Sequence, residues 1–221
     1  MTQDAAPPQW RDLAANRPGG MARERAEAEL AAMRQRTRVG TFIARAFDLK
    51  TDERAWRVGA DGEESVGARL DKLEKHGWHV LHAVPIGDRG SDIDHLLIGP
   101  GGVYTINTKN HPGKKVWVSP RQILVNGQPV RDYLPKSRTE AERATQLLTA
   151  AVGFPVFAKP VLVILTGAWT PNVTIKQQPA DVLVLDRDDV PRAFKRAPAR
   201  LTVDVIEQVY EMARRSTTWT A

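Results

Sequence analysis

The chain has 221 residues, of which 42% are apolar and 26% are charged, and its formal net charge is +6. This composition predicts a packed core and excludes a wholly disordered chain. Cysteine is absent, which excludes disulfide bonds, cysteine zinc sites and thiol catalysis. The N-terminus lacks a basic region followed by an apolar block, and no apolar run approaches the roughly 20 residues of a membrane helix. We therefore expect a soluble, cytoplasmic protein that has no membrane partner.

The first 50 residues are expected to form an N-terminal extension, and residues 51–221 a single domain. Residues 1–20 contain "APPQW" and "NRPGG" and are expected to be a loose tail. Residues 21–47 are rich in alanine, glutamate and arginine, which predicts a helix that is polar on most faces. This helix is expected to pack on the domain or on a partner, either a second copy of the chain or another protein. A nucleic-acid-binding arm is the weaker alternative.

A second helix is predicted over residues 62–76, ending at Gly77. Its apolar stripe consists of Val66, Leu70 and Leu73. Glu63 falls on that stripe and is expected to point inward, whereas Glu64 is rotated by about 100° towards solvent. A carboxylate that points inward is expected to bind a cation or to pair with another polar group. The alternative is a first-turn glutamate that only interacts with the helix dipole.

The remaining elements alternate between strands and helices. Strands are predicted at 78–86, in a hairpin at 91–109, and at 115–130, 159–167 and 180–186, and helices at 136–151, 188–197 and 201–216. Asn126-Gly127 is a strong signal for a tight turn. Residues 159–167 are continuously apolar, which predicts a central strand covered on both faces. The order predicts an α/β fold with a mixed central β-sheet flanked by helices.

The hairpin "SDIDHLLIGPGGVYTINTK" carries polar side chains at its open end. If the chain reverses at Pro100-Gly101, Asp94 faces Asn107 and Asp92 faces Lys109. Alternation along each strand then places all four on one face of the sheet. Carboxylate and amide oxygens suit Mg²⁺ or Mn²⁺, and a nearby lysine can orient a water or stabilise charge on a phosphate. The alternative is a cross-strand ion pair between Asp92 and Lys109, with Asp94 capping a turn.

The charge is unevenly distributed along the chain. Residues 51–108 carry a net charge of −4, and residues 109–143 carry +5. This order suits a metal site beside a phosphate-binding surface, although a solvated charged surface explains it as well. The candidate nucleic-acid contacts are Lys114, Lys115, Arg121, Lys136 and Arg138. Lys114 and Lys115 lie close to Trp117, and basic residues beside an aromatic ring can hold a phosphate backbone.

Four segments resemble the nuclease-related domain family, NERD: "GEESVGARLDKL", "GWHVLHAVP", "DIDHLLIGPGGVYTINTK" and "ARRSTTW". The resemblance extends over about residues 56–219, and the "IDHLLIGPGGV" block is its most specific part. That family is placed in the PD-(D/E)xK nuclease superfamily. The resemblance implies a restriction-endonuclease-like αβββαβ core. It also implies that Asp94 binds metal, that Lys109 is catalytic, and that Glu63 is the helix glutamate of the superfamily.

The chain departs from the superfamily pattern at Asn107, where an acidic residue is expected two positions before the lysine. An amide oxygen is a weaker ligand than a carboxylate for a hard dication. Asp92 can compensate, or the site is slow, prefers Mn²⁺, or is inactive. The superfamily also often places a polar residue on the following helix, for which Arg138, Glu140 and Gln146 are open candidates.

Two functions follow from these features. The first is a metal-dependent nuclease acting on DNA, with Glu63 and Asp94 as ligands of Mg²⁺ or Mn²⁺, Asn107 and Asp92 as auxiliary ligands, and Lys109 positioning water. The second is an inactive nuclease-like module that binds nucleic acid or protein. A structural domain with an ion-pair network is a third, weaker alternative.

Overall fold

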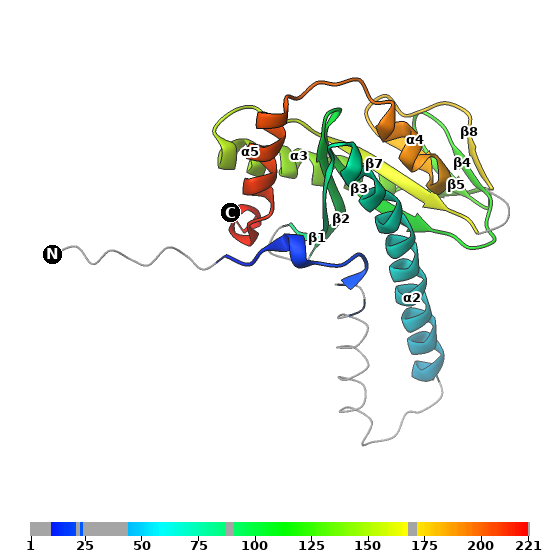
Figure 1. Ribbon diagram of the computed structural model, residues 1–221. Helices are drawn as coiled ribbons and strands as arrows, with labels where there is room; N and C mark the ends of the chain where they lie inside the picture. Colours follow the sequence, from blue (N-terminus) through cyan, green and yellow to red (C-terminus); the bar gives the residue numbers. More distant parts are fainter. Residues whose placement is uncertain (1–9, 21–22, 24–43, 87–90, 168–171, 221) are drawn as a thin grey trace, which may run out of the picture.

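The computed structural model describes residues 10–20, 23, 44–86, 91–167 and 172–220 (Figure 1). Most of the helix predicted over residues 21–47 lies outside this part of the chain. Within the described part, no helix combines the length and the apolar character needed to cross a membrane.

A five-stranded sheet forms the centre of the fold. Its strands are β1 (His79–Pro85), β2 (Asp92–Gly99), β3 (Gly102–Asn110), β7 (Ala158–Leu165) and β9 (Leu183–Asp186), in the order β1-β2-β3-β7-β9. The first three strands form an antiparallel meander, and β7 and β9 continue the sheet parallel to β3. The predicted mixed sheet is confirmed, and the element order is consistent with a nuclease-like fold.

Helices cover both faces of this sheet. One face is covered by α2 (Ala44–Leu70), its 3-10 continuation η2 (Asp71–His76) and the short α4 (Val190–Lys195). The other face is covered by α3 (Tyr133–Val152) and α5 (Val203–Ala213), whose apolar side chains pack on β2 and β3 (Figure 1). We call these the α2 face and the α3 face.

A second sheet lies beside α3 on the α3 face. It contains β4 (Val116–Val118), β5 (Ile123–Val125), β6 (Gln128–Val130) and β8 (Val173–Ile175), in the order β6-β5-β4-β8. Its inner side chains pack on Leu162, Ile164 and Val184 of the central sheet. Strands β5 and β6 are joined by the predicted turn, in which Asn126 and Gly127 have φ values of 49° and 80°. Such positive values are what a tight two-residue hairpin turn requires.

Helix α2 begins at Ala44, so the predicted start at residue 62 is wrong. The predicted end is confirmed, because η2 stops at Gly77, whose φ is 77°. The apolar stripe that marked the helix lies in its last turns, where α2 meets the sheet. The preceding turns are rich in charged residues, and helix-forming residues alone carry only a weak signal.

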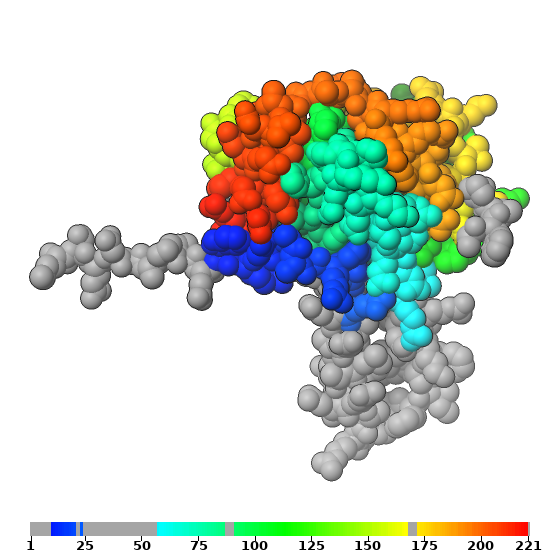
Figure 2. Space-filling model, in the orientation of Figure 1, coloured from blue at the N-terminus to red at the C-terminus, as the bar shows by residue number. Residues whose placement is uncertain are grey.

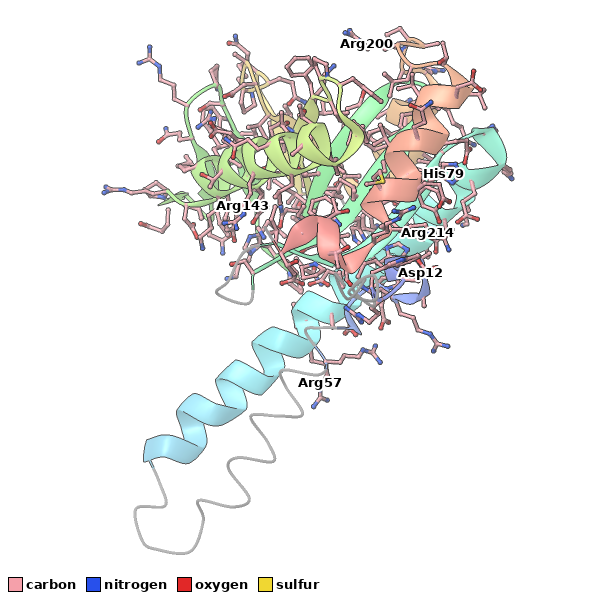
Figure 3. All side chains as sticks on the ribbon, turned by 90° about the vertical axis from the view of Figure 1, so that its left-hand side faces the viewer. Asp12, Arg57, His79, Arg143, Arg200 and Arg214 are labelled. Atoms are coloured by element: carbon pink, nitrogen blue, oxygen red, sulfur yellow. The ribbon has the colours of Figure 1, made fainter. Side chains whose placement is uncertain are left out.

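The loose tail predicted for residues 1–20 is wrong for residues 10–20, which pack on the domain. Leu13, in the short helix η1 (Leu13–Ala15), is 0% exposed and joins the core of the α3 face. Asp12 pairs with Arg214, near the last short helix η4 (Ser216–Trp219). The space-filling view shows the blue N-terminal segment against the red C-terminal residues, and Figure 3 shows Asp12 beside Arg214 (Figures 2 and 3). One buried leucine and one ion pair left too weak a pattern to predict this docking.

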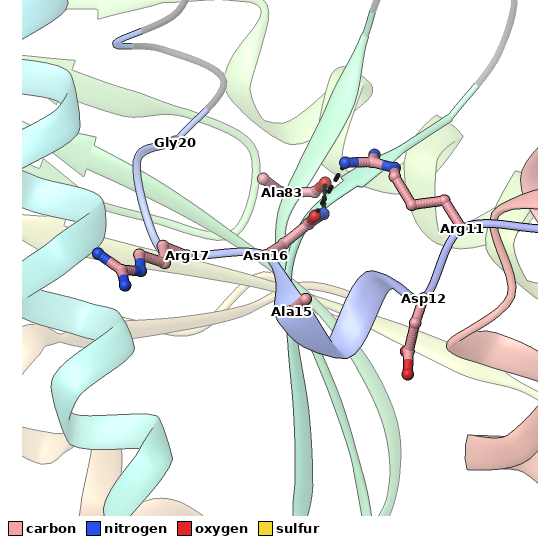
Figure 4. Close-up of a pocket in the computed structure, with 7 residues that line it drawn as sticks. All are labelled: Arg11, Asp12, Ala15, Asn16, Arg17, Gly20 and Ala83. Carbon is pink, nitrogen blue, oxygen red and sulfur yellow. Dashed lines mark hydrogen bonds between the residues drawn. The ribbon is translucent and has the colours of Figure 1, made fainter.

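The N-terminal segment also braces strand β1. The side-chain amide of Asn16 donates hydrogen bonds of 3.0 Å to the carbonyl oxygens of both His82 and Ala83. Figure 4 shows the contact between Asn16 and Ala83. Ala83 has a φ of 47°, an unusual value for a residue with a side chain. Asn16 therefore satisfies two carbonyl groups where the strand departs from regular geometry. Arg11, Arg17 and Gly20 line a pocket of about 430 Å³ beside this contact (Figure 4).

Candidate active site

The paired part of the β2–β3 hairpin has the register predicted from the sequence. Residue pairs run from His95 with Ile106 to Gly99 with Gly102, and Pro100-Gly101 forms the turn. The predicted pairs of Asp94 with Asn107 and of Asp92 with Lys109 lie beyond this paired part, and Asp94 instead accepts a hydrogen bond from the backbone of Thr108. Ile93, Leu96 and Ile98 belong to one apolar cluster, so regular alternation does not extend along β2 to Asp94.

Asn107 pairs with Leu162, which places it on the α3 face. The hairpin thus brings polar side chains of both strands together at its open end, although not by the predicted cross-strand pairing.

Asp94 is partly buried at the start of β2. Its Oδ2 accepts a hydrogen bond of 2.6 Å from the backbone N–H of Thr108. Burial raises the pKa of Asp94 to about 6, and the negative charge of Asp92 adds to this effect. The charge of Lys109 and the Thr108 hydrogen bond oppose the rise. The carboxylate is thus held by the backbone in a buried position near Lys109.

Glu63 reaches the same region from helix α2. The pKa of Glu63 is raised to about 8, mainly by burial and then by the negative charges of Asp94 and Asp92. The charge of Lys109 and a hydrogen bond from the backbone of Gly19 act in the opposite direction. The inward direction predicted from the helical stripe is therefore correct. Asp92, which is partly buried, is close enough to influence both carboxyl groups.

Asn107 is buried and contacts a carboxylate from helix α3. Its side-chain amide donates a hydrogen bond to Oε2 of Glu140. Burial raises the pKa of Glu140 to about 7. The next largest effect is the hydrogen bond from Asn107, which lowers this pKa. The charges of Asp94 and Asp92 raise it further, and the charge of Lys109 lowers it. Glu140 therefore belongs to the same cluster.

The sequence contained a signal that separates Glu140 from the other candidates on this helix. Glu140 lies three residues after Ser137 and four before Ala144, both of which are buried on α3. This spacing places Glu140 beside the inward stripe. Arg138 instead pairs with Asp181, and Gln146 is exposed.

Lys109 lies between the carboxylates and an aromatic side chain. Its positive charge opposes the raised pKa of Glu63, Asp94 and Glu140. Its Nζ lies 5.5 Å from the centre of the Tyr133 ring, a distance typical of a cation–π contact. The Tyr133 hydroxyl is 2.9 Å from Nε2 of His111. This arrangement fixes the lysine ammonium group at the edge of the cluster.

Residues 58–165 match the model of a known family, the nuclease-related domain, NERD. Over this part, just under half of its length, the chain is similar to that family. The family is part of the PD-(D/E)xK-like nuclease superfamily. Glu63, Asp94, Lys109 and Glu140 all lie within the matched part of the chain.

One relative is similar to the chain over a short stretch. An uncharacterized protein of Bacillus anthracis is 38% identical over 61 residues, which is 26% of this chain and 28% of the relative. The chain therefore covers less than a third of that relative. No solved structure matches the chain.

The oxygen donors of this nuclease-related domain suit a hard divalent cation. Among the described residues, no three His, Asp or Glu side chains are grouped closely enough to hold a metal ion by themselves. Mg²⁺, however, is usually held by one or two carboxylates together with waters and substrate phosphates. Burial is the main cause of the raised pKa values of Glu63, Asp94 and Glu140, and neighbouring carboxylates add to it. The donor set therefore fits such a cation by its chemistry and by its charge.

The predicted nucleic-acid contacts divide into two groups. Lys114, Lys115 and Arg121 are exposed and lie in or beside the second sheet. Lys136 pairs with Asp132 at 2.8 Å, and Arg138 pairs with Asp181 at 2.6 Å. Only the first group presents cations that have no acidic partner among the described side chains.

Proposed function

We propose that the chain is a metal-dependent nuclease that hydrolyses phosphodiester bonds in DNA. The observation that carries the proposal is the cluster of Glu63, Asp94 and Lys109 at the open end of the hairpin, within a nuclease-related domain. A buried carboxylate cluster with one lysine at its edge suits a reaction in which negative charge develops on a phosphate.

Asp94 and Glu63 are the proposed ligands of Mg²⁺ or Mn²⁺. When bound, such a cation acts as a Lewis acid on the phosphate and lowers the pKa of its water. The Thr108 N–H fixes one oxygen of Asp94, which leaves its other oxygen for the cation. Asp92 and the amide oxygen of Asn107 are auxiliary donors in this proposal.

Glu140 is proposed to supply the carboxylate that position 107 lacks. Asn107 donates a hydrogen bond to Glu140 and so holds this carboxylate beside Asp94. The helix would thereby restore the negative charge that the strand has lost. Outer partners of this kind typically change metal affinity or activity by about 10- to 100-fold.

Lys109 is proposed to position the attacking water and to stabilise the charge that forms on the phosphate. Its ammonium group is close enough to affect all three carboxyl groups, and the Tyr133 ring restricts where it can move. A positioned cation beside a developing charge is an effective electrostatic catalyst.

Cleavage of supercoiled plasmid with Mg²⁺ or Mn²⁺ tests this proposal. We expect the wild type to cut, Asp94→Ala to abolish cutting, and Glu140→Gln to reduce it about 10- to 100-fold. Glu142→Gln is the matched control, because Glu142 is exposed on the same helix and should leave the rate unchanged. Calorimetric titration with Mn²⁺ adds a second readout, in which the wild type binds and Asp94→Ala does not. A folded wild type that neither cuts DNA nor binds either cation would contradict the proposal.

Asn107 supports a second candidate function, a nuclease-like module that binds nucleic acid without cutting it. The neutral side chain removes one negative charge from the position where the superfamily carries an acid. This alternative predicts no cutting by the wild type, cutting by Asn107→Asp, and salt-sensitive DNA binding that survives Asp94→Ala. The same plasmid experiment therefore separates the two functions.

A further inference from the structure

The second sheet is built from segments with a one-sided charge. Residues 109–131, which include β4, β5 and β6, carry five basic residues and no acidic residue. Residues 172–180, which include β8, carry one lysine and no acidic residue. The chain as a whole has 26 acidic residues, so their absence from all four strands of one sheet leaves a surface that favours anions.

The outer face of this sheet displays an aromatic ring. The alternate residues Val116 and Val118 point inward and are buried, so Trp117 of β4 points outward and is 36% exposed. Strand β4 lies between β5 and β8, where Trp117 pairs with Leu124 and Thr174. The ring therefore lies over an interior strand of the sheet, flanked by a half-buried leucine and an exposed threonine.

Two lysines extend the same face beyond the strand ends. Lys115 precedes Trp117 by two residues, and its backbone is still hydrogen-bonded to Asn126 of the neighbouring turn. Lys176 follows Thr174 by two residues, and its N–H donates to the carbonyl of Val118. Because side chains alternate along paired strands, both lysines belong to the face that carries Trp117. Both are exposed.

The second sheet is connected to the candidate active site through the chain and through Tyr133. The loop after Lys109 leads directly into β4, and its His111 N–H donates to the carbonyl of Leu165 at the end of β7. Tyr133 begins helix α3 shortly after β6 and contacts both Lys109 and His111. The second sheet packs on Leu162 and Ile164, which pair with the site residues Asn107 and Lys109 of β3.

We propose that the outer face of the second sheet binds a single strand of nucleic acid, with one base stacked on Trp117 and flanking phosphates held by Lys115 and Lys176. This proposal rests on the proposed function, because it assigns the path by which substrate reaches Lys109. A flat aromatic ring between cations on a sheet suits unpaired bases, whose faces are accessible, better than a duplex, whose bases are stacked on each other. A stacked base contributes about 1–3 kcal/mol to binding by alanine substitution.

Fluorescence anisotropy of a labelled single-stranded oligonucleotide tests this proposal, with binding measured in EDTA. The oligonucleotide has about 20 nucleotides, which exceeds the site of one single-strand-binding fold. Cleavage does not enter this measurement. We expect Trp117→Ala to raise Kd by about 5- to 100-fold. Trp10→Ala is the matched control, because Trp10 is also exposed, at 42%, and lies beside an arginine at the N-terminal segment. Its Kd should equal that of the wild type.

The lysines are tested by the salt dependence of the same Kd. The double variant Lys115→Gln, Lys176→Gln should lower the slope of log Kd against log salt by about 0.7 for each phosphate that the protein no longer neutralises. Its control is Lys72→Gln, Lys75→Gln, which removes two exposed lysines of η2 on the α2 face and should leave the slope unchanged.

The outcomes separate this proposal from the nuclease proposal. A wild type that binds the oligonucleotide through Trp117 but never cuts DNA refutes the nuclease and leaves the interface standing. A wild type that cuts DNA while Trp117→Ala keeps the same Kd and KM refutes the interface alone. The interface is also refuted if the wild type does not bind single strands, or if it binds duplex DNA with a Kd that Trp117→Ala leaves unchanged.

Discussion

Asn107 and Glu140 form a pair in which a neutral strand residue holds a carboxylate from a helix. The hydrogen bond between them requires an amide at position 107, because two ionised carboxylates cannot donate to one another. Under the proposed function, the carboxylate that position 107 lacks is therefore supplied by α3 instead of β3. This arrangement predicts how the site responds when the strand residue is changed.

Asn107→Asp should destabilise the protein in EDTA and should be rescued by Mg²⁺ or Mn²⁺. The change places two carboxylates in contact in a buried position, which costs about 1–3 kcal/mol or more at neutral pH. A cation that binds only the folded protein restores stability by mass action. Urea unfolding in EDTA and in saturating cation measures both effects.

Gln208→Glu is the control, because it adds the same charge at an exposed position of α5. It should change the unfolding midpoint little under either condition. If Asn107→Asp unfolds at the wild-type urea concentration in EDTA, the close contact between positions 107 and 140 is not maintained.

His82 and His95 form a second buried pair, on β1 and β2. Their Nδ1 atoms are 2.8 Å apart, and Nε2 of His82 lies 3.0 Å from Oδ1 of Asp71. If His82 donates to the carboxylate, its Nδ1 must accept, and His95 must then donate from Nδ1. This assignment leaves Nε2 of His95 without a proton, consistent with its having no partner.

The contribution of these two histidines to the free energy of unfolding should fall as the pH drops below about 6.5. Burial lowers the pKa of His82, although Asp71 and Glu74 oppose this shift. Burial also lowers the pKa of His95 well below its usual value, and the charge of His82 adds to this effect. The unfolded chain therefore binds more protons than the folded chain in this range, and stability rises with pH. Each histidine contributes at most about 1.4 kcal/mol per pH unit.

Urea unfolding at pH 7.5 and pH 5.5 compares the wild type with His82→Gln. Glu63, Asp94 and Glu140 have raised pKa values and therefore act with the opposite sign in all three proteins, so the difference between proteins isolates the histidine. On going from pH 7.5 to pH 5.5, the free energy of unfolding of His82→Gln should change in the favourable direction relative to the wild type, while His76→Gln, at an exposed position, should follow the wild type. Equal changes in the wild type and His82→Gln would contradict this account.

At the scale of elements, the N-terminal segment is a structural part of the domain. Leu13 is fully buried with residues of β1, β2 and α5. Leu13→Ala should therefore lower the free energy of unfolding by about 2–5 kcal/mol, as expected for truncation of a core leucine. Val203→Ala, at a 71% exposed position, should change it by less than about 0.5 kcal/mol. Equal unfolding midpoints for the two variants would show that the segment is not docked in solution.

Elements with local signals could be predicted from the sequence, whereas those that depend on distant contacts could not. The β2–β3 register follows from a two-residue turn and strict alternation, and the Asn126-Gly127 turn from its conformational preference. The start of α2 and strand β8 were missed, because neither carries an apolar pattern of its own. The docking of Leu13 depends on a partner surface about 200 residues away in the sequence.

The same division applies to the candidate site. Glu63, Asp94 and Lys109 could be placed together because each direction follows from the period of its own helix or strand. The sequence alone leaves Glu140 among three candidates on α3, because its spacing places it beside the inward stripe but its contact with Asn107 depends on how α3 packs against β3. The assignment of catalytic and metal-binding roles to these residues remains a prediction.

At the scale of the whole molecule, the core extends well beyond the part that matches the nuclease-related domain. Residues 58–165 omit β9, α4 and α5, which supply Val184, Phe194 and Ile206 to three separate core clusters. A fragment of residues 58–165 should therefore show no cooperative unfolding transition, whereas the full chain should show one. Circular dichroism during urea titration measures this difference. A cooperative transition in the fragment would show that the matched part folds alone.

The contact between the N-terminal segment and residues 214–216 has a consequence for synthesis on the ribosome. Leu13 N–H donates to the carbonyl of Arg214, and Ser216 N–H donates to that of Arg11, so the N-terminal segment binds residues that are made about 200 positions later. At about 5–20 residues per second, roughly 10–40 seconds separate their appearance. During that interval Asn16 and Gly19 lack the anchor that holds them against Ala83 and Glu63. A nascent chain therefore carries its carboxylate cluster incompletely braced until residues 214–216 have left the ribosome, and under the proposed function we expect cutting only after that contact has formed.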